Sequence, residues 1–409
     1  VRPPSRSSGG MLMAIILSDT GHHAHLLPLT FTRPVAQLRP GILRISEGWQ
    51  LRSGLEVSYR TEAYLSTAFP TGQADGPRFE VDGSLLPMDE LVDAVLNLKP
   101  GEALVKDGRS LAFGLAGGEA PDAGAWLQPP TYERQVEFAG EVCSFTRPWH
   151  LFQHCGKAIA HDFKLLTEGR RSQPLSALNT VVGDPALVFL EEGAVCEASI
   201  LNTKGGPIYI GRDAEVMEGC LLRGPIALGD HAQLKMGAKV YGPSAFGPEC
   251  RVGGEVNNSV MLGFSNKGHD GFLGNSVLGE WCNLGADTNN SNLKNTYGEV
   301  KVYSHAEGKE VGTGLQFCGL FMGDHSKSGI NTMFNTGTAV GVSANVFGGG
   351  FPPKRIPSFA WGGADGFDTY DIERAIDAAK RVLARRDQVL TAPAEAILRH
   401  VFAQEQGGS

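Results

Sequence analysis

The sequence predicts two folds in succession: an α/β domain with a Rossmann-like sheet, then a left-handed parallel β-helix of hexapeptide repeats, followed by a short helical tail. Strand-like apolar runs alternate with helical patterns in the first half, glycines recur at a fixed interval in the second, and two helical patterns close the chain. We expect a disordered arm at 1–10, the α/β domain at 11–178, the β-helix at 179–363 and the C-terminal helices at 364–409.

The composition restricts the class of protein. The chain has 409 residues, which is more than one hydrophobic core usually serves. A net charge of −8 argues against a nucleic-acid partner, because a phosphate backbone requires a basic face, and we expect no membrane partner either. Seven widely spaced cysteines, an odd number, indicate reduced thiols and a cytoplasmic location.

The region before residue 178 has the patterns of an α/β domain. Leu12–Leu17 fits a buried parallel strand that ends in a loop, and Glu56–Tyr59 fits a second strand. Met88–Leu98 has the apolar spacing of an amphipathic helix. Ala103–Phe113 predicts a hairpin with Asp107-Gly108 as its turn. Together these elements predict a small, partly parallel sheet.

A glycine repeat predicts the β-helix. Gly193, Gly211, Gly229 and Gly247 are 18 residues apart, and several later glycines follow an aliphatic residue. A period of 18 that divides into sixes predicts three flat faces per turn, with the aliphatic residue pointing inward. We expect each glycine to bend the chain at a corner with φ values closed to other residues. The prolines of Phe351–Pro357 predict the end of the prism.

The tail predicts two helices. Asp368–Glu373 supplies a cap and early acidic residues, and Lys380–Arg386 places cations at the end of the first helix, as the helix dipole favours. A second helix is expected at Pro393–Gln404.

One motif in the first domain carries a family resemblance. Leu26-x-Pro28-Leu29-Thr30-x-x-x-Pro34 resembles the opening signature of sugar-1-phosphate nucleotidyltransferases, in which a glycine-rich loop before it cradles the nucleotide phosphates. The resemblance implies nucleotide contacts from Gly21, His25 and Arg33. This chain has His23 where the family has a second glycine, and a side chain there keeps backbone amides away from a triphosphate. A domain that only folds or binds is therefore the alternative.

The metal ligands of this domain stay unknown from the sequence. The resemblance implies Mg²⁺ if the nucleotidyltransferase domain is active. Acidic residues in loops are more often caps than ligands, and histidines after a strand are more often solvated or in contact with phosphate. The candidates are Asp19, Asp82, Asp107 and Asp162, with the histidines His22, His23 and His25.

A second, more specific motif lies in the glycine-repeat region. Its three parts are Glu255-Val256-Asn257-Asn258, then Gly268-His269-x-x-Phe272-x-Gly274, then Asn283-Leu284-Gly285-Ala286-x-Thr288. They resemble the acetyltransferase half of the bifunctional family that makes UDP-N-acetylglucosamine, with 14 residues from Glu255 to His269 and 14 from His269 to Asn283. The resemblance covers nearly all of residues 11–363 and implies a homotrimer, because hexapeptide prisms commonly associate in threes.

The resemblance assigns roles that fit acetyl transfer. Moving an acetyl group from a thioester to an amine needs a base, and imidazole titrates near neutral pH, so His269 is the candidate; the alternative is an exposed histidine without a role. Ala286 would offer its backbone N–H to the thioester carbonyl. The remaining acyl-donor candidates are Asn283, Asn292, Lys354 and Arg355, the last two for the phosphates of coenzyme A or as a solvated pair.

The acceptor site departs from the family pattern. Asn257 stands where the family has a lysine, and Phe272 stands where it has a tyrosine. Lys235, Lys239 and Lys267 are the nearby cations. These changes leave open which amino-sugar phosphate would be bound.

The predicted function is acetyl-CoA-dependent N-acetylation of an amino-sugar phosphate similar to glucosamine-1-phosphate. The first domain would add an active or vestigial sugar-1-phosphate nucleotidyltransferase that uses UTP or dTTP. One alternative is a mono-functional acyltransferase with an inert N-terminal domain. The other is a non-catalytic scaffold that binds sugar nucleotides.

Overall fold

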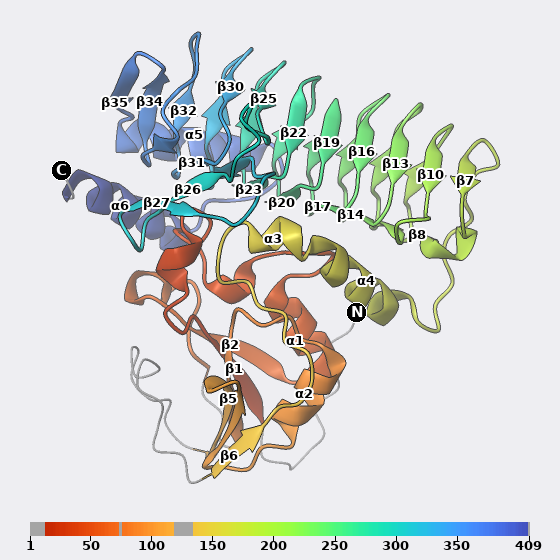
Figure 1. Cartoon of the computed structure of the whole chain (residues 1–409), viewed down its shortest axis with the longest axis vertical. Helices are drawn as coiled ribbons and strands as arrows, with labels where there is room; N and C mark the ends of the chain where they lie inside the picture. The colour runs from red at the N-terminus through yellow and green to blue at the C-terminus, as the bar shows by residue number, and fades with distance from the viewer. Residues whose placement is uncertain (1–12, 73–75, 118–133, 408–409) are drawn as a thin grey trace. The chain divides into compact units, whose positions relative to one another are not determined.

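The computed structural model describes residues 13–72, 76–117 and 134–407 (Figure 1). The chain forms two compact units, and the boundary between them does not follow the sequence order. Unit 1 is Val1–Ala24, Arg33–Leu38 and Leu43–Thr146, and unit 2 is His25–Thr32, Arg39–Ile42 and Arg147–Ser409. Part of the N-terminal signature motif therefore belongs to the same unit as the β-helix. No helix in the described ranges is long and apolar enough to cross a membrane.

Unit 1 contains a six-stranded sheet with the order β2-β1-β3-β5-β4-β6. Strand β1, second from one edge, is parallel to both of its neighbours, β2 and β3, whereas β5 is antiparallel to β3 and β4. The sheet consists of β1 (Ala14–Ser18), β2 (Glu56–Arg60), β3 (Arg78–Asp82), β4 (Glu102–Lys106), β5 (Arg109–Leu115) and β6 (Arg134–Glu137). This confirms the predicted Rossmann-like sheet.

The connections of unit 1 follow the sequence patterns. Helices α1 (Ile45–Ser53) and α2 (Asp89–Leu96) join β1 to β2 and β3 to β4. The predicted hairpin is β4–β5, and its turn residues Asp107 and Gly108 have φ of 50° and 76°. Because β2 and β3 flank β1 on opposite sides, the loop after β1 lies at the point of the sheet where ligands bind in open α/β folds.

Unit 2 contains the predicted parallel β-helix, in which each full coil adds one strand to each of three faces (Figure 1). Face A is β7 (Thr180–Val182), β10 (Ile200–Asn202), β13 (Leu221–Arg223), β16 (Lys239–Tyr241), β19 (Glu255–Asn257) and β22 (Phe272–Gly274). Face B is β8 (Val188–Leu190), β11 (Ile208–Ile210), β14 (Ile226–Leu228), β17 (Ser244–Phe246), β20 (Val260–Gly263), β23 (Val277–Glu280), β28 (Leu320–Met322), β31 (Thr338–Val340) and β33 (Arg355–Ile356). Face C is β9 (Val195–Cys196), β12 (Glu215–Val216), β15 (Gln233–Leu234), β18 (Arg251–Val252), β21 (Asn266–Lys267), β24 (Asn283–Leu284), β29 (Lys327–Ser328), β32 (Asn345–Val346), β34 (Ala360–Gly363) and β35 (Gly366–Thr369).

The glycine repeat is in register with the coils, but its physical reason differs from the predicted one. Gly211, Gly229 and Gly247 stack at one corner, where a Cβ on Gly211 would lie 2.7 Å from the backbone of Gly229. These three glycines are needed because the coils approach closely, since none of them has a positive φ. The left-handed corner position is filled by other residue types, such as Asp213 with φ of 53°. Gly193 takes that corner position and not the stacking one, so its place in the predicted column was wrong.

The interior of the β-helix is an apolar column formed by the inward positions of the three faces. Leu190, Ile210, Leu228 and Phe246 are in register on face B and are buried. On the outside of face B, α4 (Cys155–Thr167) packs on β14 and β17, following the short helix α3 (His150–Gln153). A single coil cannot cover this apolar interior, so each coil buries its inward side chains by stacking on the next coil.

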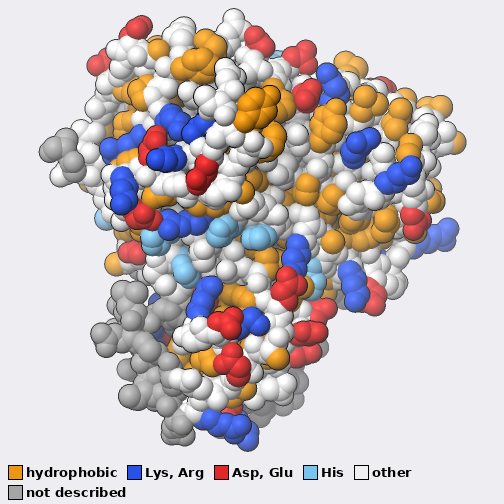
Figure 2. All heavy atoms as spheres, viewed as in Figure 1, with side chains coloured by type: hydrophobic (Ala, Val, Ile, Leu, Met, Phe, Trp, Pro, Cys, Tyr) orange, Lys and Arg blue, Asp and Glu red, His pale blue; other side chains and the backbone are white. Residues whose placement is uncertain are grey.

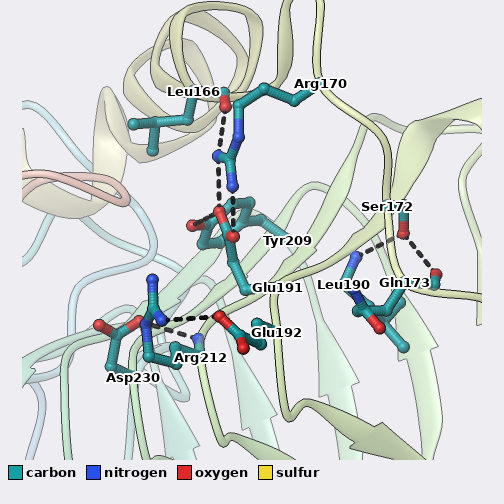
Figure 3. A network of polar contacts seen from close by, with 10 residues as sticks. All are labelled: Leu166, Arg170, Ser172, Gln173, Leu190, Glu191, Glu192, Tyr209, Arg212 and Asp230. Atoms are coloured by element: carbon teal, nitrogen blue, oxygen red, sulfur yellow. Dashed lines mark hydrogen bonds and ion pairs between the residues drawn. The ribbon is translucent and has the colours of Figure 1, made fainter. Parts of the chain in front are cut away.

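A half-exposed ion pair fastens the end of α4 to the first coils (Figure 3). The Arg170 guanidinium donates to both oxygens of Glu191, at 2.8 and 2.5 Å, and Tyr209 Oη donates to Glu191 at 2.7 Å. Arg170 also lies over the ring of Phe189, 5.2 Å from its centroid. Although burial raises the pKa of Glu191, the hydrogen bonds from Arg170 and Tyr209 hold it below its usual value.

The polar segment after residue 286 leaves the coil, as predicted. It adds β25 (Asn289–Asn290), which pairs with β30 (Met333–Phe334), and a hairpin of β26 (Lys301–Ser304) and β27 (Lys309–Gly312). The N-terminal segment His25–Thr32 packs in the same unit: Thr32 Oγ1 donates to Asp324 at 2.7 Å, and His25 Nδ1 lies 3.9 Å from Glu307 Oε1.

The C-terminal part differs from the prediction in one respect. Coils continue past Phe351–Pro357, because β33 and β34 add to faces B and C before β35 folds back antiparallel. The two predicted tail helices are confirmed as α5 (Ile372–Ala384) and α6 (Ala392–Gly407). The side chain of Asp371 caps α5 by accepting from Arg374 N at 3.0 Å.

Candidate functional site

Most of the predicted acetyl-transfer residues gather where face C turns into face A. We call this place the His269 corner, defined by the turns 235–238, 268–271 and 285–288, with the short turn 253–254 of one further coil between the first two. His269 lies in the second turn and is exposed. The second and third turns are joined by a hydrogen bond from Asp287 N to Asp270 O at 3.0 Å.

The coil register brings residues from distant parts of the motif together at this corner. Lys239, Glu255 and Phe272 are directly aligned on adjacent strands of face A. On face C, Asn283 is aligned with Asn266, one coil from the turn that carries His269. A cation, a carboxylate, an imidazole and an amide therefore lie along one edge of the prism.

The backbone at this corner has a donor that is open to a ligand. The N–H of Ala286 makes no hydrogen bond to any acceptor in the described residues, whereas its carbonyl accepts from Asn331 N at 2.8 Å. A free backbone N–H is the type of group that stabilises a developing oxyanion. The exposed side chain of Asn283 is near it on the preceding strand.

Lys235 is in the first turn, and its amine donates to Gln233 Oε1 at 2.7 Å. Burial and the charge of Arg251 lower the pKa of Lys235 below its usual value. Lys239 is exposed and lines a groove of about 320 Å³ on face A, with Ile200, Leu221 and Tyr241. Figure 2 shows hydrophobic side chains with Lys and Arg among them over the strands that Figure 1 labels β10, β13 and β16.

The structure does not bring the other predicted residues to the corner. Asn257 is at the opposite end of its strand, aligned with Gly274. The amide of Asn292 donates to Asn275 Oδ1 at 2.8 Å. Lys354 and Arg355 belong to face B, where Lys354 donates to Lys301 O at 3.1 Å and Arg355 lies over Tyr303.

Lys267 has a position that the sequence reasoning missed. Its side chain points into the prism and is 2% exposed, so it is not on the surface where an acceptor phosphate would bind. The sequence alone does not show that Lys267 points inward, because this depends on the register of the strands of face C.

In unit 1, charged side chains meet at the carboxyl ends of β1 and β3. Asp82 is buried, and Arg109 Nη2 and His22 Nε2 both contact its Oδ2, the latter at 3.4 Å. Asp82 Oδ1 accepts from Thr20 Oγ1 at 3.1 Å and from Ser84 N at 2.9 Å. Although burial raises the pKa of Asp82, hydrogen bonding and charge from His22 and the charge of Arg109 lower it to about 2.

The second carboxylate of this edge, Asp19, is also fully engaged. Its Oδ1 accepts from Val35 N at 2.8 Å, and its Oδ2 accepts from Thr61 Oγ1 at 2.6 Å. Burial raises the pKa of Asp19 to about 7, against the lowering effect of these two hydrogen bonds.

These carboxylates do not fit Mg²⁺. Mg²⁺ is held by carboxylate oxygens, and Asp82 is already paired with the Arg109 cation, while each oxygen of Asp19 accepts a hydrogen bond from the protein that would compete with the ion. Across the described ranges, no group of three or more His, Cys, Asp or Glu side chains is arranged to hold a metal ion. The candidate Asp107 lies in the β4–β5 turn, and the candidate Asp162 lies in α4, which belongs to unit 2.

The residues that the resemblance assigned to nucleotide binding are divided between the two units. Gly21 is in the loop after β1 with φ of 79°, which requires glycine-like freedom. His25 is in unit 2, where its Nδ1 lies 3.0 Å from Arg147 Nη1. Arg33 is in unit 1 and is buried, with 5% of its surface exposed.

Comparisons with known proteins agree with the two resemblances. Residues 15–171 match the family model described as sugar nucleotidyl transferase. A bifunctional sugar-1-phosphate nucleotidylyltransferase/acetyltransferase of Sulfurisphaera tokodaii is 36% identical over 146 residues, which is 35% of this chain and 36% of the relative. The bifunctional protein GlmU of Methanocaldococcus jannaschii is 34% identical over 87 residues, 21% of each chain.

A solved structure, the polysialic acid O-acetyltransferase OatWY, aligns with 48% of this chain and 86% of its own, at 13% identity and a TM-score of 0.16. These values are too low to support an argument about function. The aligned regions span about a third or less of the length of the curated relatives named above. Residues 15–171 thus resemble the sugar nucleotidyl transferase family, and the predicted resemblance to bifunctional nucleotidylyltransferase/acetyltransferases is confirmed.

Proposed function

We propose that the β-helix transfers an acetyl group from acetyl-CoA to the amine of an amino-sugar phosphate, with His269 as the general base. The observation that carries the proposal is the His269 corner, where an exposed imidazole lies beside an unused backbone N–H and an exposed asparagine on adjacent coils. The names of the bifunctional relatives support the same reaction class.

The residues at the corner suffice for the transfer. The acceptor amine attacks the thioester carbonyl carbon as His269 takes its proton, so an N–C bond forms. Ala286 N–H donates to the carbonyl oxygen as negative charge develops on it. The C–S bond then breaks, and the thiolate of coenzyme A leaves and is protonated. Lys239 and Lys235 are the cations in this region that would attract the acceptor phosphate.

The N-terminal domain has a different part in this proposal. It binds a nucleotide or a sugar phosphate at the loop after β1 and takes no metal ion on Asp19 or Asp82. A mono-functional acyltransferase with an inert N-terminal domain is the second candidate, and the hydrogen-bonded carboxylates of this edge favour it.

The proposal includes a homotrimer in the cytoplasm. Ile200, Leu221 and Tyr241 on face A have exposed fractions of 42%, 48% and 42%, and this exposed apolar surface suits contact with a neighbouring prism. The cytoplasmic location rests on the cysteines, of which Cys196, Cys220, Cys250 and Cys282 contribute to the β-helix core.

Thiol release from acetyl-CoA in the presence of glucosamine-1-phosphate or another amino-sugar phosphate tests the proposal. Wild-type protein should release thiol, and His269→Ala should reduce kcat by about a hundredfold or more. His231→Ala is the matched control, because His231 is also an exposed corner histidine of the β-helix. Absence of thiol release by the wild type with every amino-sugar phosphate would favour the scaffold alternative.

A further inference from the structure

Lys267 is a charged residue in an apolar column. On face C, Lys267 is aligned with Val252 of the preceding coil. Because Asn266 is aligned with Asn283, Lys267 is also aligned with Leu284 of the following coil. All three side chains point inward and are buried. An ammonium group in such a place loses its hydration, so the position disfavours lysine unless the amine has a specific partner.

The amine has such a partner in the turn that carries the candidate base. Lys267 Nζ donates to the backbone carbonyl of His269 at 2.5 Å. Backbone hydrogen bonds hold the flanks of this turn: Gly253 N donates to Lys267 O at 2.7 Å and Glu255 N donates to Gly271 O at 3.2 Å. In the described part of the chain, no backbone N–H donates to the His269 carbonyl, so the lysine is the group that holds this peptide.

The carbonyl and the side chain of His269 point in different directions. Gly268 has open space around the position of a Cβ, whereas a Cβ on Gly254 of the preceding coil would lie 3.0 Å from His269 O. The carbonyl of His269 thus points toward the preceding coil and the interior, and its side chain is exposed.

The charged groups that face the amine are few. Asp270, in the same turn, and Asp287, in the next coil, are the carboxylates that act on it, and the inward neighbours of Lys267 on face C are apolar. Burial lowers the pKa of Lys267 to about 8, and these two aspartates partly oppose the shift. The lysine therefore titrates in a range where enzyme activity is readily measured.

We propose that Lys267 is a positioning residue for the acetyl transfer: from inside the prism its amine fixes the peptide of His269 and so the orientation of the imidazole at the corner. This inference rests on the proposed function, because it names a residue that serves the same site. Lys267 touches neither substrate and acts through His269.

The test compares Lys267→Met with Leu234→Met, which lies in the same inward column two coils earlier. Methionine is unbranched like lysine and one atom shorter, and it has neither the charge nor the donor. In Lys267→Met we expect kcat to fall about tenfold or more, with KM for acetyl-CoA within about twofold, because the base is displaced rather than the donor site. Leu234→Met should keep the wild-type kcat. A Lys267→Met protein that folds and keeps the wild-type kcat would overturn the proposal.

Lys267→Arg keeps a donor and supplies a second measurement, which also decides the matter if Lys267→Met does not fold. Arginine does not lose its proton in this range, so an alkaline decline of kcat near pH 8 in the wild type should be absent from Lys267→Arg. The same decline in both proteins would contradict the proposal.

A third readout does not depend on catalysis. In histidine-labelled protein, the ring resonance that disappears in His269→Ala should shift or broaden in Lys267→Met and remain in place in Leu234→Met. This change is expected even if no acetyl transfer is found, so failure of the proposed function and failure of this inference are distinguishable. An unchanged His269 resonance in Lys267→Met would refute the positioning role.

Discussion

The carboxyl edge of the sheet in unit 1 and the His269 corner of unit 2 both collect polar side chains, but they leave them in different states. In unit 1, Asp82 and Asp19 are buried, and all four carboxylate oxygens accept hydrogen bonds from the protein. At the corner, His269 and Asn283 are exposed, Asn283 Oδ1 accepts a long hydrogen bond from Asn266 Nδ2 at 3.4 Å, and Ala286 N–H has no acceptor within the described ranges. Polar groups that already have partners stabilise a fold, whereas those without partners are available to a ligand.

The largest expected effect of this comparison concerns catalysis. His269→Ala should lower kcat for acetyl transfer by about 10²- to 10⁴-fold, since removal of a general base has effects of this size. KM for acetyl-CoA should change little, because the base acts mainly in the transition state. Steady-state thiol release measures both constants, and a kcat within about threefold of the wild type would remove His269 from the site.

Asp19 offers a sharper test of the buried edge. Its pKa is raised from 3.8 to about 7, so unfolding at neutral pH is favoured by ionisation of the carboxyl group. The stability that Asp19 contributes is fully present below pH 4 and is lost as the pH rises to about 7, by roughly 4 kcal/mol. Asp19→Asn should remove its part of the decline of unit 1 stability between pH 4 and pH 7 and leave the part due to Glu80, because burial also raises the pKa of Glu80 to about 7.

Hydrogen exchange of peptides from β1 and β3, measured as a function of pH and urea, reports on unit 1. Asp93→Asn is the control, because Asp93 is an exposed residue of α2. An equal pH dependence of unit 1 stability in Asp19→Asn and in the wild type would show that the pKa of Asp19 is not raised in the folded protein.

Asp82 should respond to pH in the opposite direction. Its pKa is lowered from 3.8 to about 2, so its stabilisation is present above pH 4 and is lost as the pH falls toward 2. Asp82→Asn should destabilise unit 1 by about 3 kcal/mol at pH 7, because Arg109 loses its carboxylate partner. Urea unfolding followed by exchange of the β3 peptides gives this value. A free energy of unfolding within about 0.5 kcal/mol of the wild-type value, the range expected of neutral surface substitutions, would contradict this prediction.

The smallest effect concerns the ion pair that fastens α4 to the coils. Glu191→Gln should lower stability by about 1 kcal/mol, since the Arg170 side chain is 46% exposed and solvent screens part of the interaction. The pKa of Glu191 is lowered in the folded protein. The contribution of the ion pair to stability should therefore disappear as the pH falls below the pKa of an ordinary glutamate.

Glu192→Gln is its matched control. Glu192 pairs with Arg212 at 3.1 Å, with side-chain exposures of 80% and 51%, so the change should cost less than about 0.5 kcal/mol. Urea midpoints of the two variants give the comparison, and an equal loss in both would mean that burial of Glu191 adds nothing.

The sequence was sufficient to predict the order of folds, because apolar periodicity and glycine spacing report directly on strands and coils. It misassigned Gly193, since spacing alone cannot distinguish a glycine needed for a positive φ from one needed for close stacking. It also treated Lys267 as a surface cation, because whether a residue points inward depends on a register that the insertions in the repeat obscure.

The candidate site was predictable only in part, for a related reason. His269, Asn283 and Ala286 come together because coils of nearly constant length align them. Asn292 follows β25, where the coil is interrupted, and its amide is held by Asn275. His25 was expected at a nucleotide but belongs to the unit of the β-helix, an arrangement that no local pattern encodes.

Mass spectrometry of the reaction products tests the central comparison most directly. Wild type, Asp82→Asn and His269→Ala are each incubated with acetyl-CoA and an amino-sugar phosphate under conditions where all three are folded. We predict N-acetylated sugar phosphate from the wild type and from Asp82→Asn, and almost none from His269→Ala. Acetylation that persists in His269→Ala, or that is lost in folded Asp82→Asn, would contradict the assignment of the chemistry to the His269 corner.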